Sequence, residues 1–449
     1  MPAVWLMAMS LTGSVAVSPT AVAVSVASRR QMASVASGGT VTTTDTDTLR
    51  RRRRHVIGSG AVLIALSGPG QTAGFSVFVD PLTDALDVSR NSLTFAYLVG
   101  TLAASTTGGW LGRRFDQVGV GRGLRLVTGA LTLALLLASA SVHIVMLTVA
   151  IYGLRSFGQT GMPLSASVFV ANAVRERRGA ALGALTALGG SAIPLTPLLG
   201  DRLIAVLGWR AAWWVLAGVV VVVGMVMSRR VTRLETDGIG AGNVGNTVDD
   251  TMAADVALGR DVIWGWAVVT AGFVSSGFVA TGLGFHQVAI LGERGLSSAA
   301  AAGNFVPQSI ASVVTALTVG RLVDRVPARV VVPFNMAVLA LAALSIGRVD
   351  SSVTAAGYGI AVGMAAAATA ASEGALIARW IPSGVLGTWR GRMTSVMVVS
   401  TALAPYVFSL VADVTGSFTT TVQLAAIVPA TVAAIAVVAP LPLVEHHSG

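Results

Sequence analysis

The chain has 449 residues, of which 54% are hydrophobic and only 11% are charged, and its mean hydropathy is +0.76. Soluble domains carry about 25% charged residues, so most of this surface is expected to face lipid. All 30 basic residues are Arg and there is no Cys, which excludes disulfides, thiolate metal sites, a Walker-A lysine and the lysine aldimines of pyridoxal phosphate and retinal.

The first 55 residues differ from the rest of the chain. Residues 3–28 are apolar but interrupted by Ser, Thr and Pro, and they lack the positive start of a signal peptide. Ser and Thr dominate residues 29–48, so we expect residues 1–55 to form a disordered cytoplasmic tail. A cleavable signal, a thirteenth helix and a true start at Met32 are the alternatives.

Twelve apolar stretches follow, and each is long enough for a transmembrane helix, which needs about 20 residues. They cover residues 56–79, 91–111, 124–142, 144–172, 180–200, 211–228, 262–290, 298–319, 330–347, 353–378, 391–412 and 419–442. The sequence therefore predicts an all-α membrane protein with twelve transmembrane helices. Its parts are a six-helix bundle at 56–228, a polar cytoplasmic linker at 229–261, a second six-helix bundle at 262–442 and a tail at 443–449.

The arginines are distributed unevenly between the two sets of loops. One set holds 24 of them and the opposite set holds five. Because Lys and Arg gather in cytoplasmic loops, this bias places both termini in the cytoplasm of a multi-pass protein of the cell membrane. The net charge of +10 therefore reflects the orientation of the protein in the membrane, and we expect no nucleic-acid partner. The remaining arginine, Arg155, lies inside the fourth span.

Landmarks recur between the two halves of the chain at a nearly constant offset. The loop after the second span reads GRRFDQVG from Gly112, and the loop after the eighth reads GRLVDRVPAR from Gly320, an offset of 208. Ser89 and Ser297, just before the same pair of spans, are also 208 apart. Such duplication is typical of transporters built from two six-helix halves.

These motifs resemble the major facilitator superfamily over residues 56–442. Gly-x-x-x-Asp in both loops matches that superfamily's signature, and the resemblance implies two pseudo-symmetric six-helix bundles. Other strings resemble the bacterial branch of monocarboxylate and oxalate/formate carriers. They are SGPGQTAGFSVFVDPL, YGLRSFGQTG, GFHQ and DVTGSF.

The resemblance also implies that the signature loops latch the halves together in the outward-open state. Asp116 with Arg122 would form one latch, and Asp324 with Arg325 and Arg329 the other. A carboxylate at a helix end can accept charge-assisted hydrogen bonds from arginines nearby. The alternative is that these are ordinary solvated loop charges.

Arg155 is the first candidate for binding an anionic substrate. It lies about 17 Å from the outer end of its span at 1.5 Å per residue, near the middle of the bilayer. An arginine there costs at least ~2.5 kcal/mol, so it should face a partner or an aqueous cavity. Gln159, one turn further on, shares its face. The alternative is a structural ion pair with Glu373.

Two side chains are candidates for carrying a coupling proton. Glu373 is the only acidic residue deep within any predicted span, and it lies in the tenth. His286 lies toward the outer end of the seventh span, and histidine titrates near neutral pH. The alternatives are that Glu373 only neutralises Arg155 and that His286 is a packed residue.

Four further polar residues are candidates for contacting the substrate. Gln71 and Thr72 follow Gly68-Pro69-Gly70, which is expected to interrupt the first span and free backbone carbonyls. Asn304 and Gln308 lie one turn apart on the eighth span. Each pair could instead mark only a packing kink.

The sequence therefore predicts a secondary transporter of a small organic anion, a monocarboxylate by resemblance, coupled to protons. It predicts no enzymatic activity, no cofactor and no metal site, and we expect a monomer in the lipid bilayer. Export of amphiphilic compounds and a non-transporting membrane sensor on the same fold are the alternatives.

Overall fold

The computed structural model describes residues 43–174, 178–236, 260–322, 326–380 and 383–439. The chain divides into two units, residues 1–54 and 55–449, and the packing of the helices belongs to the second. The tail at 443–449 and most of the expected linker lie outside the described residues. A helix begins at Thr43 and another ends at Thr236, so the described ends of the expected tail and linker are helical.

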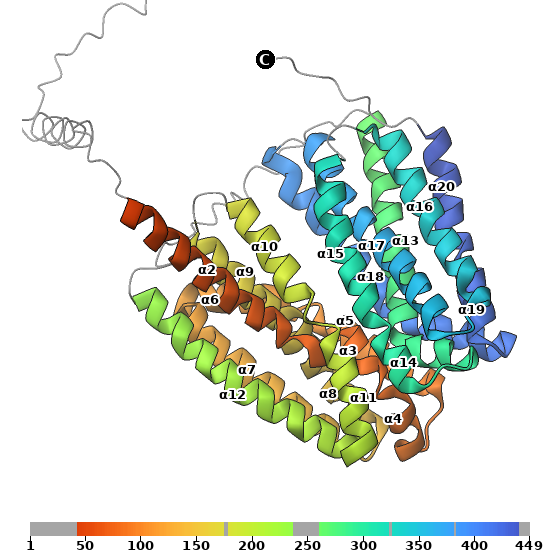
Figure 1. Ribbon diagram of the computed structural model, residues 1–449, viewed down its shortest axis with the longest axis horizontal. Coiled ribbons are helices and arrows are strands. Elements are labelled where there is room, and N and C mark those ends of the chain that lie inside the picture. The colour runs from red at the N-terminus through yellow and green to blue at the C-terminus, as the bar shows by residue number, and fades with distance from the viewer. Residues whose placement is uncertain (1–42, 175–177, 237–259, 323–325, 381–382, 440–449) are drawn as a thin grey trace, which may run out of the picture. The chain divides into compact units, whose positions relative to one another are not determined.

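The first half of the chain is built from helices in series. They are α2 (Thr43–Ala65), the 3₁₀ turn η1 (Gly68–Gly70), α3 (Thr72–Ser76), α4 (Val79–Leu86), α5 (Arg90–Ala104), α6 (Thr107–Val118), α7 (Val120–Ser139), α8 (Ile144–Gly153), the π-helix η2 (Leu154–Gly161), α9 (Met162–Ala173), α10 (Arg178–Gly190), α11 (Leu195–Leu207) and α12 (Trp209–Thr236). Figure 1 shows them from red to light green.

The second half of the chain is also built from helices in series. Its helices are α13 (Arg260–Glu293), α14 (Ser298–Gly303), α15 (Phe305–Leu322), α16 (Ala328–Leu344), the 3₁₀ turn η4 (Ser345–Arg348), α17 (Ser352–Trp380), α18 (Ser383–Thr415), α19 (Phe418–Ala425) and α20 (Ile427–Val438). Within the described ranges every regular element is helical. The all-α prediction is therefore confirmed.

In the described residues, eight helices are long and apolar enough to cross a membrane, or nine if the bent pair 51–76 and 79–86, which meets at 69°, is one span. The other three predicted spans, 91–111, 144–172 and 298–319, consist of shorter helical pieces in series. Their breaks fall at Ser105, at η2 and at Asn304. The interruptions thus coincide with polar residues.

The repeat in the sequence has a structural counterpart in two helix caps. The hydroxyl of Ser89 accepts a hydrogen bond from the backbone N–H of Ser92 at the start of α5. The hydroxyl of Ser297 does the same for Ala300 at the start of α14. A serine in this position satisfies one of the unpaired N–H groups of a first turn, so both halves begin a helix in the same way.

Each half has its own buried hydrophobic clusters. In the first half, Trp213 stacks on Phe78 with ring centroids 3.7 Å apart. In the second half, one cluster surrounds Phe408 and another surrounds Leu376. Large apolar side chains such as Leu133 and Val437 are exposed on the helix surfaces. A soluble monomer rarely exposes so many, whereas a bilayer covers them.

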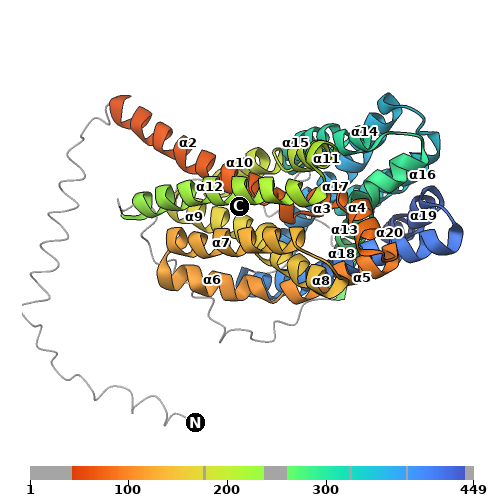
Figure 2. The same ribbon diagram turned by 90° about the horizontal axis from the view of Figure 1, so that it is seen from below.

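The halves meet through a small set of helices. The most extensive contacts pair α5 with α18, α3 with α13 and α11 with α14 (Figures 1 and 2), and smaller ones pair α10 and α11 with α15. We call the end of the helices that carries the connections 140–143, 294–297 and 416–417 the outer end, following the arginine distribution. The contacts of α5 and α14, which begin at this end, join the halves there.

Candidate functional site

The first span is interrupted where Gly68-Pro69-Gly70 occurs, as expected. α2 ends at Ala65, η1 covers the three residues, and α3 begins at Thr72. A Cβ atom added to Gly70 would lie 2.3 Å from the carbonyl oxygen of Leu154 and 2.7 Å from Cα of Gly158. Only glycine permits this approach, which presses the interrupted first span against η2.

The fourth span contains the π-helical segment η2, which carries Arg155 and Gln159. A π-helix is wider than an α-helix, is rare, and occurs frequently at functional sites. The widening alters the face that each side chain occupies. Two irregular segments, η1 and η2, therefore cross at Gly70 and Gly158 and frame the candidate site.

Arg155 is buried, with only 4% of its surface exposed. Its Nη1 donates hydrogen bonds of 3.3 Å to the carbonyl oxygen of Gly70 and to Oγ1 of Thr72. Its Cζ lies 5.1 Å from the ring centroid of Tyr97, within range of a cation–π interaction. Its Nε is buried and has no hydrogen-bond partner among the described residues. The guanidinium is thus held through one nitrogen while another is unused.

The structure brings part of the predicted set together. Thr72 contacts Arg155 directly, and the backbone of Gln159 lies beside Gly70. The side-chain Oε1 of Gln159 is buried, without a partner in the described part of the chain. Gln71 makes a different contact, since its Nε2 donates to the hydroxyl of Ser67 at 2.9 Å.

Tyr97 is a site residue that the sequence did not single out. Its hydroxyl lies 3.1 Å from Oγ1 of Thr72, and the residue is fully buried on α5. A tyrosine in an apolar span resembles an ordinary core residue. Because a phenol inside an apolar span needs a hydrogen-bond partner, the position of Tyr97 within the second span was the one available signal.

Arg155 and Glu373 form no ion pair with each other within the described ranges, to which both belong. Glu373, on α17, borders a cavity of about 10 Å³ together with Asn335 and Ser372. Nδ2 of Asn335 donates to the hydroxyl of Ser372 at 3.1 Å. This cavity is about the size of one water molecule, and most of its accessible lining is apolar.

His286 is buried on α13 among aromatic rings. Its Nε2 donates to the carbonyl oxygen of Pro405 at 2.8 Å, and its ring contacts those of Phe285, Phe408 and Phe418. Because a carbonyl oxygen can only accept a hydrogen bond, Nε2 of His286 carries the proton. Nδ1 is therefore the acceptor nitrogen of the neutral ring. Nδ1 is buried and meets no partner among the residues that the structure describes. His286 is therefore a packed residue whose Nδ1 could still accept a proton.

The polar pair on the eighth span packs against α17, with Asn304 at the junction of α14 and α15 and Gln308 on α15. Asn304 is 5% exposed, and neither of its amide atoms has a hydrogen-bond partner in the described ranges. Gln308 borders a second cavity of about 10 Å³, together with Gln287 and the buried hydroxyl of Tyr358. The described hydrogen bonds of Arg155 include neither Asn304 nor Gln308.

The signature sequence after the second span is followed by backbone N–H groups that bind a carboxylate from α12. Asp116 and Arg122 are exposed, and the described residues show no ion pair between them in this conformation. The carboxylate of Glu235 instead accepts hydrogen bonds of 2.8 and 3.0 Å from the backbone N–H groups of Val120 and Gly121. Glu235 was not singled out from the sequence.

The second signature loop can be described only in part. Asp324 and Arg325 lie outside the described residues, while Arg329 is exposed at the start of α16. Both latches therefore stay predictions. Their expected role is in the outward-open state, whereas the halves of this conformation are joined at the outer end.

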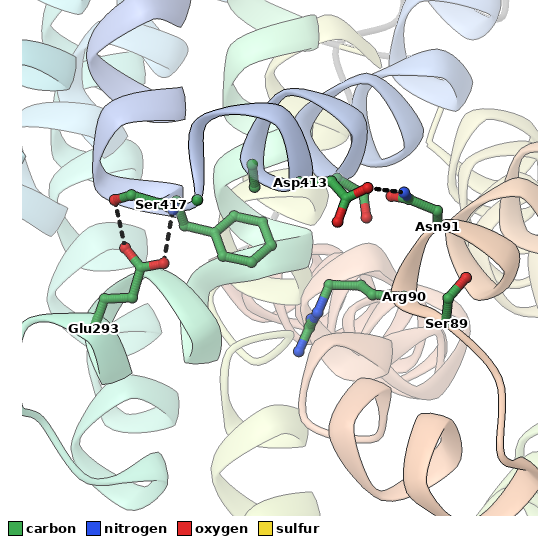
Figure 3. A pocket seen from close by; sticks show the side chains of 10 residues that line it. Ser89, Arg90, Asn91, Glu293, Asp413 and Ser417 are labelled. Atoms are coloured by element: carbon green, nitrogen blue, oxygen red, sulfur yellow. Dashed lines mark hydrogen bonds between the residues drawn. The ribbon is translucent and has the colours of Figure 1, made fainter.

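A pocket of about 310 Å³ lies at the outer end between α5, α13, α18 and α19. Nδ2 of Asn91 donates to Oδ2 of Asp413 at 3.2 Å, a bond that joins the two halves (Figure 3). Arg90, ion-paired with Asp80, lies over the ring of Phe418 at 5.4 Å. None of these contacts was expected from the sequence.

The class of protein follows from the fold and from comparisons with known proteins. The described part of the chain consists of helices in series, many of which are long and apolar enough to cross a membrane. This architecture defines a multi-pass helical membrane protein. The family model described as Major Facilitator Superfamily matches residues 61–347. The chain belongs to the major facilitator superfamily, and it is a membrane transporter.

Two solved structures of a bacterial homolog to the human lysosomal transporter Spinster are similar to the chain. The inward-facing, occupied form has a TM-score of 0.60 at 13% identity and covers 86% of this chain and 95% of its own. The inward-facing, unoccupied form has a TM-score of 0.63 at 14% identity, covering 87% and 96%. At such identities the likeness shows the fold alone. No curated protein matches the chain.

Proposed function

We propose that this transporter moves a small organic anion, a monocarboxylate, across the cell membrane by alternating access coupled to protons. The observation that carries the proposal is the state of Arg155. It is buried between two interrupted spans, and within the described residues it has no carboxylate partner and its Nε is unused. An unpaired buried charge is costly, so a bound anion would offset part of that cost.

The chemistry of the guanidinium favours a carboxylate. Its planar fork of N–H groups matches the two oxygens of a carboxylate, which it can bind bidentately. Arg155 carries one positive charge and pairs with no carboxylate in the described part of the chain. A singly charged anion would therefore balance it. A dianion would leave one negative charge unpaired in the low-dielectric interior.

Proton coupling rests on two residues of the second half. Glu373 lies beside a water-sized cavity that Asn335 and Ser372 also border, and His286 has an acceptor nitrogen without a partner in the described ranges. A proton entering with a monoanion makes the transport electroneutral. That avoids moving net charge against the membrane potential, which costs about 2.3 kcal/mol per charge at 100 mV.

The test is uptake of labelled pyruvate, acetate and benzoate into proteoliposomes, with and without an inward proton gradient. We expect uptake that the gradient accelerates. Arg155→Gln should reduce uptake at least tenfold, because it removes the charge and the fork. Arg155→Lys keeps the positive charge but lacks the planar fork, so it should retain only part of the wild-type uptake.

Two results would contradict this proposal. Equal uptake by the wild type and Arg155→Gln would remove Arg155 from the site. Export of a lipophilic dye without uptake of any small carboxylate would favour an efflux carrier. A matched control is Arg229→Gln, because Arg229 is exposed on α12 and belongs neither to the signature loops nor to the contacts of Arg155.

A further inference from the structure

Tyr97 stands between the anion site and the contact that joins the two halves. The centroid of its ring lies 5.1 Å from Cζ of Arg155 and 4.6 Å, in edge-to-face geometry, from the ring centroid of Phe285. Its hydroxyl lies 3.1 Å from Oγ1 of Thr72. Arg155, Thr72 and Tyr97 belong to the first half of the chain, whereas Phe285 belongs to the second.

The hydroxyl of Tyr97 orders the acceptor that holds the guanidinium. Oγ1 of Thr72 accepts from Nη1 of Arg155 and shares a hydrogen bond with Tyr97. With Nη1 occupied, Nε and Nη2 of Arg155 make no hydrogen bond within the described residues. These two atoms form one edge of the guanidinium, and that edge can hold one carboxylate with two parallel hydrogen bonds.

The ring of Tyr97 receives a residue from the opposite half. Phe285 is buried and belongs to the hydrophobic cluster of the first half, where it also contacts Phe75 with ring centroids 5.9 Å apart. Separation of the halves at the outer end requires α13 to leave α3 and α5. Phe285 would then leave Tyr97 and expose the face of the ring that it covers.

We propose that Tyr97 is the positioning residue through which anion binding at Arg155 is tied to closure of the outer end. Its hydroxyl fixes the free edge of the guanidinium, and its ring accepts Phe285 when the halves close. This inference rests on the proposed function, because it assumes an anion at Arg155. Linkage is reciprocal, so the anion must change the closure equilibrium by the factor by which closure changes anion affinity.

Pairs of variants separate the two roles of Tyr97. Tyr97→Phe removes the hydroxyl but keeps the ring, and Phe285→Leu removes the aromatic contact but leaves Arg155 and Thr72 intact. Phe95→Leu is the matched control. Phe95 also lies on α5 and contacts Tyr406 across the halves at 5.5 Å, and the described contacts of Arg155 do not include it.

Binding and closure are measured on the same purified protein. Pyruvate binding is followed by the thermal shift of the protein, because a ligand stabilises the state that it binds. Closure is followed by the distance between spin labels on Val142→Cys and Val414→Cys, two exposed outer positions, one in each half. The chain has no native Cys, so only these positions are labelled.

For Tyr97→Phe we expect pyruvate binding to weaken about tenfold, the loss typical of one hydrogen bond that supports a charged group. The label distances without pyruvate should stay as in the wild type. For Phe285→Leu we expect longer label distances without pyruvate and a smaller shift when pyruvate is added. Phe95→Leu should leave the pyruvate-induced shift unchanged.

The outcomes distinguish this inference from the proposed function. Wild-type protein that fails to bind pyruvate, acetate and benzoate overturns both. Normal binding by Arg155→Gln overturns the proposed function and, with it, the role of Tyr97. Binding that is lost in Arg155→Gln but unchanged in Tyr97→Phe overturns this inference alone, as does an unchanged pyruvate-induced distance shift in Phe285→Leu.

Discussion

Asn91 on α5 donates a hydrogen bond of 3.2 Å to the carboxylate of Asp413 on α18, 322 residues later in the chain (Figure 3). It is a side-chain bond that crosses between the halves at the outer end. Because the bond is exposed, its contribution lies at the lower end of the usual range of about 0.5–1.5 kcal/mol. Asp413→Ala should therefore increase the population open at the outer end by about two- to threefold.

The same spin-label pair at positions 142 and 414 measures this change. Leu133→Ala is the control, since Leu133 is an exposed apolar side chain on the first half. Label distances that are the same in Asp413→Ala and the wild type would show that this bond does not hold the halves together.

Gly70 should not tolerate a side chain. A Cβ atom there would lie 2.3 Å from the carbonyl oxygen of Leu154, a backbone atom that cannot give way without moving η2. We expect Gly70→Ala to lower the melting temperature and abolish anion binding. Gly58→Ala on α2 is the matched control, because nothing in the described structure lies within 4 Å of its added Cβ. A Gly70→Ala protein with normal melting and binding would contradict the crossing of η1 and η2.

Glu293 should stabilise the start of α19. Its carboxylate accepts hydrogen bonds from the backbone N–H groups of Phe418 and Thr419, at 2.7 and 2.8 Å, and from the hydroxyl of Ser417 at 3.0 Å. Removing a helix cap costs about 1 kcal/mol. Glu293→Ala should therefore melt at a lower temperature than the wild type, whereas Glu293→Gln, which keeps an acceptor oxygen, should lose less. Equal melting of all three proteins would argue against the cap.

Glu235 should protect the backbone at the start of α7. It accepts from the N–H groups of Val120 and Gly121, next to Gly119, whose φ is 81°. In Glu235→Ala these two amides should exchange with deuterium faster, by roughly tenfold for the loss of hydrogen bonds to a charged acceptor. Asp116→Asn, a change at an exposed residue of the same loop, should leave their exchange unaltered in this conformation.

Replacing Glu373 should separate anion transport from proton transport. In Glu373→Gln the side chain keeps its shape but cannot carry a proton, so anion exchange should continue while accumulation driven by a proton gradient is lost. A fluorescent pH probe inside the proteoliposomes measures the accompanying proton flux. Proton flux that persists with anion flux in Glu373→Gln, but stops in His286→Asn, would move the coupling role to His286.

Much of the fold was readable from the sequence, because the bilayer imposes a simple rule on it. Every backbone polar group in lipid must be satisfied within its own segment, so long apolar stretches become helices. The interruption at Gly68-Pro69-Gly70 and the paired caps at Ser89 and Ser297 follow from equally local chemistry. Arg155 stood out because a charge at mid-depth is costly wherever its partners lie.

The surroundings of Arg155 depend on how distant segments pack. Thr72 and Tyr97 lie 83 and 58 positions earlier in the chain, and they reach Arg155 only because Gly70 and Gly158 let two interrupted helices cross. The same holds for Glu235 of α12, which bonds to the start of α7, and for Asn91 with Asp413. Hydropathy and charge are properties of each residue and its neighbours along the chain, so they specify the helices, their expected orientation and the isolated charge. The side chains that meet this charge are set by helix crossings and close glycine contacts, which exist only once the chain has packed.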